Sequence, residues 1–345
     1  MISIDAMGGD HGAPVTVPGV ARVLKAASGA KIRFLLHGDQ SAIESALARA
    51  PGVAGVSEIR PANGVISSEA KPAHAMRRGR GTSMWNAVES VHLGEASAAV
   101  SAGNTGALMA ISRLILRMTG DMDRPALVAN WPTARGITSV LDVGANIICD
   151  ADRLVEFAIM GVAYHRATHR IERPTVGLLN VGTETEKGHE DVRGADRILR
   201  GADFDFEYRG FVEGDDIAKG TVDVVVTDGF TGNVALKTAE GLARFFTAQM
   251  RAAFTNSSRS RLGALIARPS LRRMAERLDT GSTNGGPFLG LNGIVVKSHG
   301  GADERGFANA VNLAVNLARS GVTAEIDRNL QRRPASTATK ETIEA

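Results

Sequence analysis

Cysteine is almost absent from this sequence, since Cys149 is the only one among 345 residues. An intramolecular disulfide and a cysteine-rich zinc site are therefore excluded. Aromatic residues are also scarce, at 4%, which leaves few rings on which the bases of a single-stranded nucleic acid stack. The net charge is only +3, so the composition gives no reason to expect a nucleic-acid partner.

Long apolar runs are missing as well. No stretch approaches the about 18 consecutive apolar residues of a membrane-spanning helix. Residues 1–5 lack the basic segment and the long apolar segment of a signal peptide. We therefore expect a cytoplasmic protein, for which peripheral contact with a membrane stays open.

Several common cofactor and catalytic motifs are absent. There is no G-x-x-x-x-G-K-[ST] loop, and no predicted strand leads into G-x-G-x-x-G, so ordinary ATP and dinucleotide sites lack support. No G-x-S-x-G elbow indicates a serine acyl-enzyme, and the histidines lack metal-ligand spacing. Cys149 has no neighbouring base in the sequence, which disfavours a nucleophilic role. We expect neither a cofactor nor a metal ion.

The sequence does contain short apolar runs that alternate with longer amphipathic ones. Runs nearly continuous in Val, Ile, Leu and Ala are typical of strands buried on both faces of a parallel sheet. Apolar residues recur at helical spacing after Thr105 and over residues 152–166 and 232–254. The alternation predicts a three-layer α/β/α fold with a mostly parallel sheet. The predicted strands are residues 2–6, 32–37, 96–101, 127–131, 139–143, 176–181, 222–227 and 293–297.

These elements predict a single α/β domain over residues 1–330. Residues 241–280 are expected to protrude from it as a basic amphipathic helical segment, because no acidic residue lies between Gly241 and Ala275 while arginines are frequent. The second part of this segment predicts two short helices separated at Pro269. Residues 331–345 are polar, with Pro, Ser, Thr and Ala, and predict a disordered tail.

Six of the predicted strands lead into loops that combine glycine with Asn, Thr, Ser, Asp or His. Ligands bind beyond the carboxyl ends of parallel strands, so we expect several of these loops to gather at one edge of the sheet. Glycine exposes backbone N–H groups, and a helix behind the loop adds its positive end, which together bind an anion. For any single loop the alternative is a turn with an N-cap such as Thr105 or Thr231. The loops are residues 5–12, 101–110, 141–146, 180–188, 227–233 and 297–303.

The SAGNTG loop is the strongest single candidate for an anion site. Its glycines permit close approach and its polar side chains offer hydrogen bonds; the residues are Ser101, Gly103, Asn104, Thr105 and Gly106. Lys187 lies near Thr183 in another of these loops and is a second candidate for binding phosphate. The alternative interpretation of Lys187 is a solvated lysine at the start of a helix. Charged or titratable residues in the other loops are candidates for catalysis, with a cap or turn residue as the alternative. They are Asp10, His11 and His299.

Seven segments in order make the sequence recognisable: DAMGGDHGAP, SAGNTGALM, RPAL, LDVGAN, GLLNVGTE, VVVTDGFTGNVALKT and GLNGIVVKSHG. They resemble the bacterial phosphate acyltransferases, the PlsX family, from Met1 to about Gly321. The resemblance implies conversion of fatty acyl-acyl carrier protein and inorganic phosphate to acyl phosphate and holo-acyl carrier protein, which feeds phospholipid synthesis. It also implies a fold related to isocitrate and isopropylmalate dehydrogenases and to phosphotransacetylase. A homodimer, and use of the product by a membrane-bound glycerol-3-phosphate acyltransferase, are implied as well.

Such an enzyme has to position phosphate and thioester and to stabilise the tetrahedral oxyanion. We assign the SAGNTG loop, Thr183 and Lys187 to phosphate. The oxyanion and substrate candidates are Asn146, Asp228, Gly229, Thr231, Gly232 and Lys297. The catalytic candidates are Asp10, His11, Lys187, Asn233 and His299. Among these, a histidine would carry a proton to the departing thiolate.

Three other functions stay open at this stage. The first is a coenzyme A-dependent phosphate acetyl- or butyryltransferase of related fold. The second is a metal- and NAD-dependent decarboxylating dehydrogenase, which a group of aspartates suggests: Asp215, Asp216, Asp223 and Asp228. The third is a non-catalytic regulator that binds phosphate or lipid precursors. The number of polar loops after strands favours catalysis.

The predicted helix over residues 232–254 is apolar on more than one narrow face, so we expect the core and a partner to bury it in a C2 dimer. In the segment that follows, arginines surround apolar residues, which is typical of a surface that docks on an anionic membrane. The same arginines would also attract the acidic acyl carrier protein. The alternative to both docking roles is a helical hairpin whose apolar residues only complete the dimer core. We therefore expect peripheral association with the inner face of the cell membrane. The docking candidates are Leu262, Leu265, Ile266, Arg268, Arg272 and Arg273.

Overall fold

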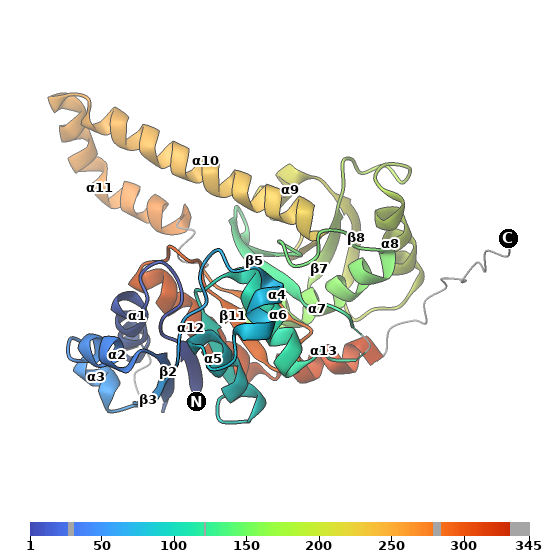
Figure 1. Ribbon diagram of the computed structural model, residues 1–345. Helices are drawn as coiled ribbons and strands as arrows, with labels where there is room; N and C mark the ends of the chain where they lie inside the picture. Colours follow the sequence, from blue (N-terminus) through green and yellow to red (C-terminus); the bar gives the residue numbers. More distant parts are fainter. Residues whose placement is uncertain (27–30, 121, 279–283, 332–345) are drawn as a thin grey trace.

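The computed structural model describes residues 1–26, 31–120, 122–278 and 284–331, with residues 275–278 described by their backbone alone. An 11-stranded sheet forms the middle layer, and helices cover both of its faces (Figure 1). The strand order is β3-β2-β1-β4-β11-β10-β5-β6-β9-β7-β8. The predicted three-layer α/β/α class with a mostly parallel sheet is confirmed.

The strands are β1 (Ile2–Asp5), β2 (Phe34–Gly38), β3 (Ser57–Pro61), β4 (Ala98–Ser101), β5 (Ala126–Thr133), β6 (Gly136–Leu141), β7 (Thr175–Leu179), β8 (Glu207–Val212), β9 (Val224–Val226), β10 (Gly286–Leu289) and β11 (Ile294–Lys297). The helices are α1 (Ala13–Ala26), α2 (Gln40–Leu47), α3 (Pro51–Ala54), α4 (Pro72–Arg78), α5 (Ser83–His92), α6 (Thr105–Leu116), α7 (Ala151–His169), α8 (Glu190–Gly201), α9 (Gly214–Lys219), α10 (Gly229–Thr255), α11 (Ser258–Leu278), α12 (Glu304–Ser320) and α13 (Val322–Gln331).

All eight predicted strands are present, and the structure contains three further strands that were not predicted. Two of them, β3 and β8, form the two edges of the sheet. Their sequences, SEIRP and EYRGFV, carry charged residues because an edge strand has one side open to water. The third, β10, is only four residues long and begins with Gly-Pro, which reads as a turn in the sequence.

The strands run in two groups of opposite direction. β1, β2, β3, β4 and β11 are parallel to one another, and so are β6, β7, β8 and β9. Between the groups, β10 is antiparallel to both β11 and β5, and β5 is antiparallel to β6. The carboxyl ends of the two groups therefore point in opposite directions. The six glycine-containing loops therefore gather as two sets of three, one after β1, β4 and β11 and one after β6, β7 and β9.

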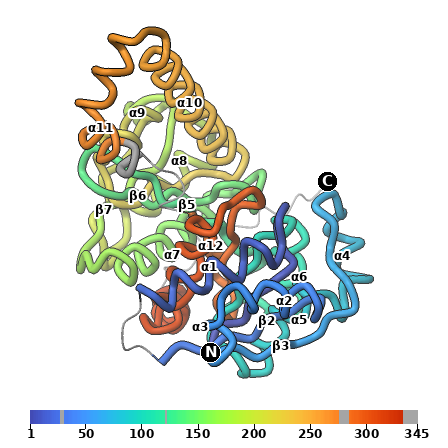
Figure 2. The backbone as a smooth tube through the Cα atoms, turned by 90° about the vertical axis from the view of Figure 1, so that its left-hand side faces the viewer, coloured from blue at the N-terminus to red at the C-terminus, as the bar shows by residue number. Residues whose placement is uncertain are grey.

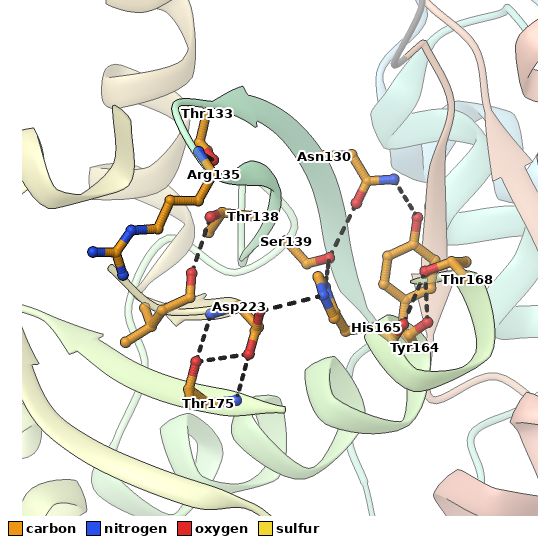
Figure 3. Close-up of polar contacts among 11 residues, drawn as sticks. Asn130, Thr133, Arg135, Thr138, Ser139, Tyr164, His165, Thr168, Thr175 and Asp223 are labelled. Atoms are coloured by element: carbon orange, nitrogen blue, oxygen red, sulfur yellow. Dashed lines mark hydrogen bonds and ion pairs between the residues drawn. The ribbon is translucent and has the colours of Figure 1, made fainter. Parts of the chain in front are cut away.

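A chain of polar side chains, with the buried Ser139 and His165 at its centre, links α7 to β5, β6 and β7 and to the residue before β9 (Figure 3). The Ser139 hydroxyl on β6 donates to Asn130 Oδ1 on β5 at 3.1 Å and lies 2.9 Å from His165 Nδ1 on α7. His165 Nε2 in turn lies 3.9 Å from the Asp223 carboxylate, which precedes β9. Asp223 also accepts the backbone N–H of Thr175 on β7 at 2.7 Å. The network therefore ties α7 to the sheet by directional contacts as well as by apolar packing.

Helices α10 and α11 form a hairpin that projects from the α/β body (Figures 1 and 2). α10 is 27 residues long, and α11 runs back beside it. The prediction of two short helices separated at Pro269 is wrong, because α11 continues through this residue. The φ angle of proline is compatible with a helix, and α11 continues although Pro269 removes one N–H donor and crowds the preceding turn. Among the described residues, no helix is long and apolar enough to cross a membrane.

Candidate active site

The ends of β1, β4 and β11 lie side by side and bring together Asp5, Ser101 and Lys297. β4 is parallel to both neighbours, and Ser101 is directly opposite Lys297. The Ser101 hydroxyl donates to Asp5 Oδ2 at 2.6 Å and accepts the Gly103 N–H at 3.0 Å. Asp5 is only 1% exposed, and burial raises the pKa of its carboxyl above the ordinary range. Asp5 was not among the predicted site residues.

The Lys297 ammonium is held by two backbone carbonyls from different loops. It donates to Ala102 O at 3.4 Å and also to Ser298 O. The pKa of Lys297 is lowered to about 8, chiefly by burial; the positive charge of Lys237 adds to the lowering, while Asp5 and Asp10 oppose it. Because Lys237 belongs to α10, this interaction also marks where the first group of loops approaches the second.

The glycine-rich loops of the first group pack backbone against backbone. A Cβ atom on Gly8 would lie 2.9 Å from Gly103 N, so no larger residue fits there without movement. The Asp10 N–H donates to Gly300 O at 3.0 Å, and His299 Nδ1 accepts the Gly301 N–H at 3.2 Å. The structure thus brings the predicted residues Asp10 and His299 together, and His11 follows directly in the same loop.

The predicted phosphate loop leads directly into α6. Asn104 is the N-cap: its Oδ1 accepts the Ala107 N–H at 2.8 Å, and its Nδ2 donates to Ser68 O at 2.5 Å. The alternative of Thr105 as the cap is therefore wrong, and Thr105 is instead the first helical residue. Gly106 lies under Pro72, since a Cβ here would be 3.0 Å from its ring. The N-terminal end of α6 thus sits beneath the segment that precedes α4.

In the second group of loops, Asp142 is the central acceptor. Its carboxylate accepts the N–H groups of Leu127 at 2.9 Å and Ala145 at 3.1 Å, and the Asn146 side-chain amide at 2.9 Å. Asp142 is fully buried, and this burial raises the pKa of its carboxyl. Asp142 was not among the predicted site residues, although its position directly after the apolar run of β6 was the available signal.

The oxyanion candidates of the second group already have partners within the fold. Asn146 Nδ2 donates to Pro125 O at 2.8 Å as well as to Asp142, and the Gly229 N–H donates to Asn146 O at 2.6 Å. Gly232 packs against the backbone of Asp142 so closely that a Cβ would clash. An oxyanion role for these donors would require them to exchange these partners.

The first turn of α10 carries the remaining candidates of this group. Asp228, rather than Thr231, is the N-cap: Asp228 accepts both the N–H and the hydroxyl of Thr231, at 2.9 and 2.8 Å. Asn233 is exposed and lies beside Gly144. One turn later, Lys237 pairs with Glu240 at 3.0 Å. Asn233 and Lys237 therefore share the helix face that starts at the site.

Lys187 and Thr183 lie in the loop after β7. Because β7 pairs with β9, this loop follows the strand next to the one that leads into α10. Lys187 Nζ pairs with Glu184 at 2.8 Å, and both side chains are about half exposed. Hydrogen bonding to Glu184 raises the pKa of Lys187. The contacts of Lys187 are thus with its own loop, not with the SAGNTG loop.

The fold and these loops define a class: a three-layer α/β protein with the architecture of the phosphotransacylases. A branched-chain phosphotransacylase from Enterococcus faecalis superimposes with a TM-score of 0.59 at 13% identity, over 93% of this chain and 100% of that one. The phosphotransacetylase EutD of Staphylococcus aureus gives 0.56 at 16% identity, over 92% and 93%. A protein from Salmonella typhimurium described as a 4-hydroxythreonine-4-phosphate dehydrogenase gives 0.54 at 12%, over 92% and 99%. At these identities the likeness concerns the fold alone.

Sequence comparison gives the family. Residues 1–325 match the family model described as "Fatty acid synthesis protein". The Phosphate acyltransferase of Caulobacter vibrioides is 64% identical over 338 residues, which are 98% of this chain and 93% of that protein. The Phosphate acyltransferase of Phenylobacterium zucineum is 61% identical over 336 residues, 97% and 95% of the two chains. The chain belongs to the phosphate acyltransferase family, and the resemblance seen in its motifs is confirmed.

Proposed function

We propose that this chain, an acyltransferase by family, transfers a fatty acyl group from acyl carrier protein to inorganic phosphate. A phosphate oxygen attacks the thioester carbonyl carbon, the carbon–sulfur bond breaks, and the products are acyl phosphate and the carrier thiol. Phosphate is already an anion at neutral pH and the thioester is already reactive. The enzyme therefore contributes mainly positioning and stabilisation of the oxyanion.

One observation carries the proposal: three helices begin directly behind polar, glycine-containing loops in this family's fold. Asn104, Asp228 and Asp303 cap α6, α10 and α12. The positive N-terminal ends of such helices favour an anion, and Lys297 adds a cation between the first and the third. A phosphate and a developing oxyanion both suit this environment.

The test is a product assay with acyl-acyl carrier protein and phosphate, in which hydroxylamine traps the acyl phosphate as a hydroxamate. We expect hydroxamate only when phosphate is present. Parallel reactions with acyl-coenzyme A separate the carrier-dependent enzyme from a coenzyme A-dependent one. Phosphate binding without turnover would identify a non-catalytic regulator and overturn the proposal.

We also infer that the α10–α11 hairpin contacts partners. Its side chains leave large apolar groups in solvent, among them Phe245 at 57% and Leu265 at 63% exposure. Exposed apolar side chains of this size are typical of an interaction surface. We assign α10 to a homodimer interface. We assign the apolar and arginine residues of α11 to an anionic membrane surface, with acyl carrier protein as the competing partner.

A further inference from the structure

Residues 65–81, which include α4, form an excursion from the sheet with a high density of positive charge. The α4 excursion contains four Lys or Arg residues and one Glu, and its net charge of +3 equals that of the whole 345-residue chain. All of its basic residues are exposed. They are Lys71, His74, Arg77, Arg78 and Arg80. The α4 excursion therefore presents a strongly basic face to solvent.

The cations of this face lack the partners that several other exposed cations have. Lys187, Lys219 and Arg197 each pair with a carboxylate, at 2.8, 2.6 and 2.8 Å. Among the described residues, none of the four Lys and Arg side chains of the α4 excursion has a hydrogen bond or an ion pair. Their charge is not neutralised within the fold, so it produces a positive potential that attracts an acidic partner.

Backbone hydrogen bonds and apolar packing hold the α4 excursion in place. The Asn63 N–H donates to Gly81 O at 2.9 Å and the Ser83 N–H donates to Gly64 O at 3.0 Å, which joins the two ends of the excursion. Ala75 on α4 is buried in an apolar cluster of the body. The basic side chains therefore project from a fixed support, which reduces the entropy lost when a partner binds.

The α4 excursion lies over the N-terminal end of α6, where the proposed phosphate loop is (Figures 1 and 2). Ser68 O accepts Asn104 Nδ2 at 2.5 Å, and a Cβ on Gly106 would lie 3.0 Å from the Pro72 ring. A protein docked on this excursion is thus next to the loop to which we assign phosphate. The thioester of a carrier protein is attached to a pantetheine arm, so the carrier has to dock beside the site and not within it.

Two apolar side chains are exposed on the same excursion, Val65 at 52% and Met76 at 38%. Arginine and methionine are enriched in protein–protein interfaces, in which a polar rim surrounds an apolar centre. Docking on a membrane requires a larger apolar face, such as the one on α11. The composition of the α4 excursion therefore favours an acidic protein over a lipid surface.

We propose that the α4 excursion is the docking surface for acidic acyl carrier protein, which brings the carrier's thioester to the loop that enters α6. The proposal rests on the proposed function, in which this carrier is the acyl donor. The α10–α11 hairpin lies apart from α4 in both views (Figures 1 and 2). The arginines of α11 are then left to the membrane surface.

The main variant reverses three charges: Arg77→Glu/Arg78→Glu/Arg80→Glu. We expect its KM for acyl-acyl carrier protein to rise about tenfold or more, because electrostatic steering changes association rates by about 10- to 1,000-fold. Its kcat and its phosphate KM should stay near those of wild type. Added salt should raise the carrier KM of wild type and should change that of the variant much less.

A neutral variant guards against a folding defect. Arg77→Gln/Arg78→Gln/Arg80→Gln should raise the carrier KM in the same direction by a smaller factor. Urea unfolding of both variants should match wild type, because the three arginines have no partners in the fold. If the glutamate variant does not fold, the glutamine variant decides.

The matched control is Lys25→Glu/Arg33→Glu/Arg49→Glu, which makes the same change in net charge. These three residues are also exposed. Arg33 directly precedes β2, while Lys25 and Arg49 lie at the ends of α1 and α2, so all three lie near the opposite edge of the sheet. The control should keep a carrier KM close to wild type. An equal rise in both variants would reduce the effect to net charge and overturn the docking surface.

Crosslinking locates the carrier without any need for turnover. Cys149 is the only cysteine of the sequence and is buried, so a benzophenone maleimide attaches to Arg78→Cys at the new position. Illumination should crosslink this variant to holo-acyl carrier protein, whereas Arg49→Cys with the same label should not react. Absence of hydroxamate from the wild-type protein would reject the proposed function, while the crosslink would still report docking.

Three results would overturn the docking surface. The first is an unchanged carrier KM in the glutamate variant. The second is a rise in the phosphate KM alone, which would mean that the α4 excursion attracts phosphate. The third is loss of binding to vesicles that contain anionic lipid while the carrier KM stays at the wild-type value, which would assign the excursion to a membrane.

Discussion

Asn104 has two structural contacts that bear on the proposed phosphate site. Its Oδ1 caps α6 through the Ala107 N–H, and its Nδ2 reaches the Ser68 carbonyl. The first contact stabilises the helix whose positive end faces the loop. The second contact holds the segment before α4 over that helix end. Loss of the Asn104 side chain should therefore lower the stability of the fold and weaken phosphate binding.

For Asn104→Ala we expect about 1 kcal/mol lower stability, as for other N-cap deletions, together with a raised phosphate KM. Urea unfolding and the hydroxamate assay measure the two effects. Asp39→Ala is the matched control, because Asp39 caps α2 through the Ala42 N–H at 2.8 Å and has no assigned role in the site. It should lose similar stability and keep its phosphate KM; an Asn104 variant that behaves in the same way would remove Asn104 from the phosphate site.

Among whole elements, α7 contacts the sheet through polar side chains as well as apolar ones. His165 on α7 is fully buried between Ser139 and Asp223, and its ring lies 4.4 Å from that of His169. Burial and the nearby His169 lower the pKa of His165 to about 4, against the ordinary 6.5, although Asp223 opposes the shift. The neutral imidazole is thus the form that fits between α7 and the sheet.

This shift predicts lower stability in mild acid. Between pH 6.5 and 4 the unfolded chain binds more protons at this histidine than the folded chain, so stability falls as the pH drops through that range. At pH 5 the loss from His165 should be about 2 kcal/mol relative to pH 7. Urea unfolding at both pH values should show a smaller difference for His165→Asn, whereas His92→Asn, an exposed histidine on α5, should behave as wild type. An equal pH difference in all three proteins would contradict this origin.

On α11, three apolar side chains point into solvent: Leu262, Leu265 and Ile266 are 61%, 63% and 75% exposed. For Leu265→Glu with Ile266→Glu we expect loss of binding to vesicles that contain anionic lipid, with turnover in solution nearly unchanged. The apolar contribution is removed, and two negative charges are added near the surface. Leu93→Glu with Leu114→Glu is the matched control, because these leucines are also more than half exposed. Vesicle binding that survives in the α11 variant would reject the membrane assignment.

The arginines of α11 separate membrane docking from carrier docking. Arg272→Glu with Arg273→Glu should raise the KM for acyl-acyl carrier protein if these residues steer the acidic carrier, and added salt should weaken the effect. The phosphate KM serves as the internal control and should not change. An unchanged carrier KM would exclude this surface as the carrier-docking site.

For the molecule as a whole, the exposed face of α10 is the strongest sign of assembly. Leu242, Phe245 and Phe246 are 53%, 57% and 63% exposed, and burying such side chains stabilises by about 1.5–3 kcal/mol each. We expect light scattering at micromolar concentration to give the mass of a dimer, and Phe245→Glu with Phe246→Glu to give a monomer. A wild-type protein that is monomeric throughout would reject the dimer.

At the scale of the fold, the sequence by itself determined the class and most of the strands. Eight strands were predicted from apolar runs that need burial on both faces, and all eight are present. Helical spacing of apolar residues predicted α6, α7 and α10. Both predictions succeed because local sequence patterns reflect which sides of an element face water. The glycine-containing loops were also visible, as were the motifs that gave the family. In contrast, β3 and β8 were missed, since edge strands carry charged residues that resemble loops.

Only the tertiary structure decided the direction of the strands and the partners of individual side chains. Strand direction depends on the antiparallel β10–β5–β6 crossing, which no local pattern specifies. The burial of Asp5 and Asp142 depends on neighbours far along the chain, such as Ser101 and Leu127. The same holds for Lys297, whose pKa is set by its burial and by charges on other elements, including α10. The sequence specifies which functional group each side chain carries. Its hydrogen bonds, its solvent exposure and hence its pKa are set only when segments distant in the sequence pack together.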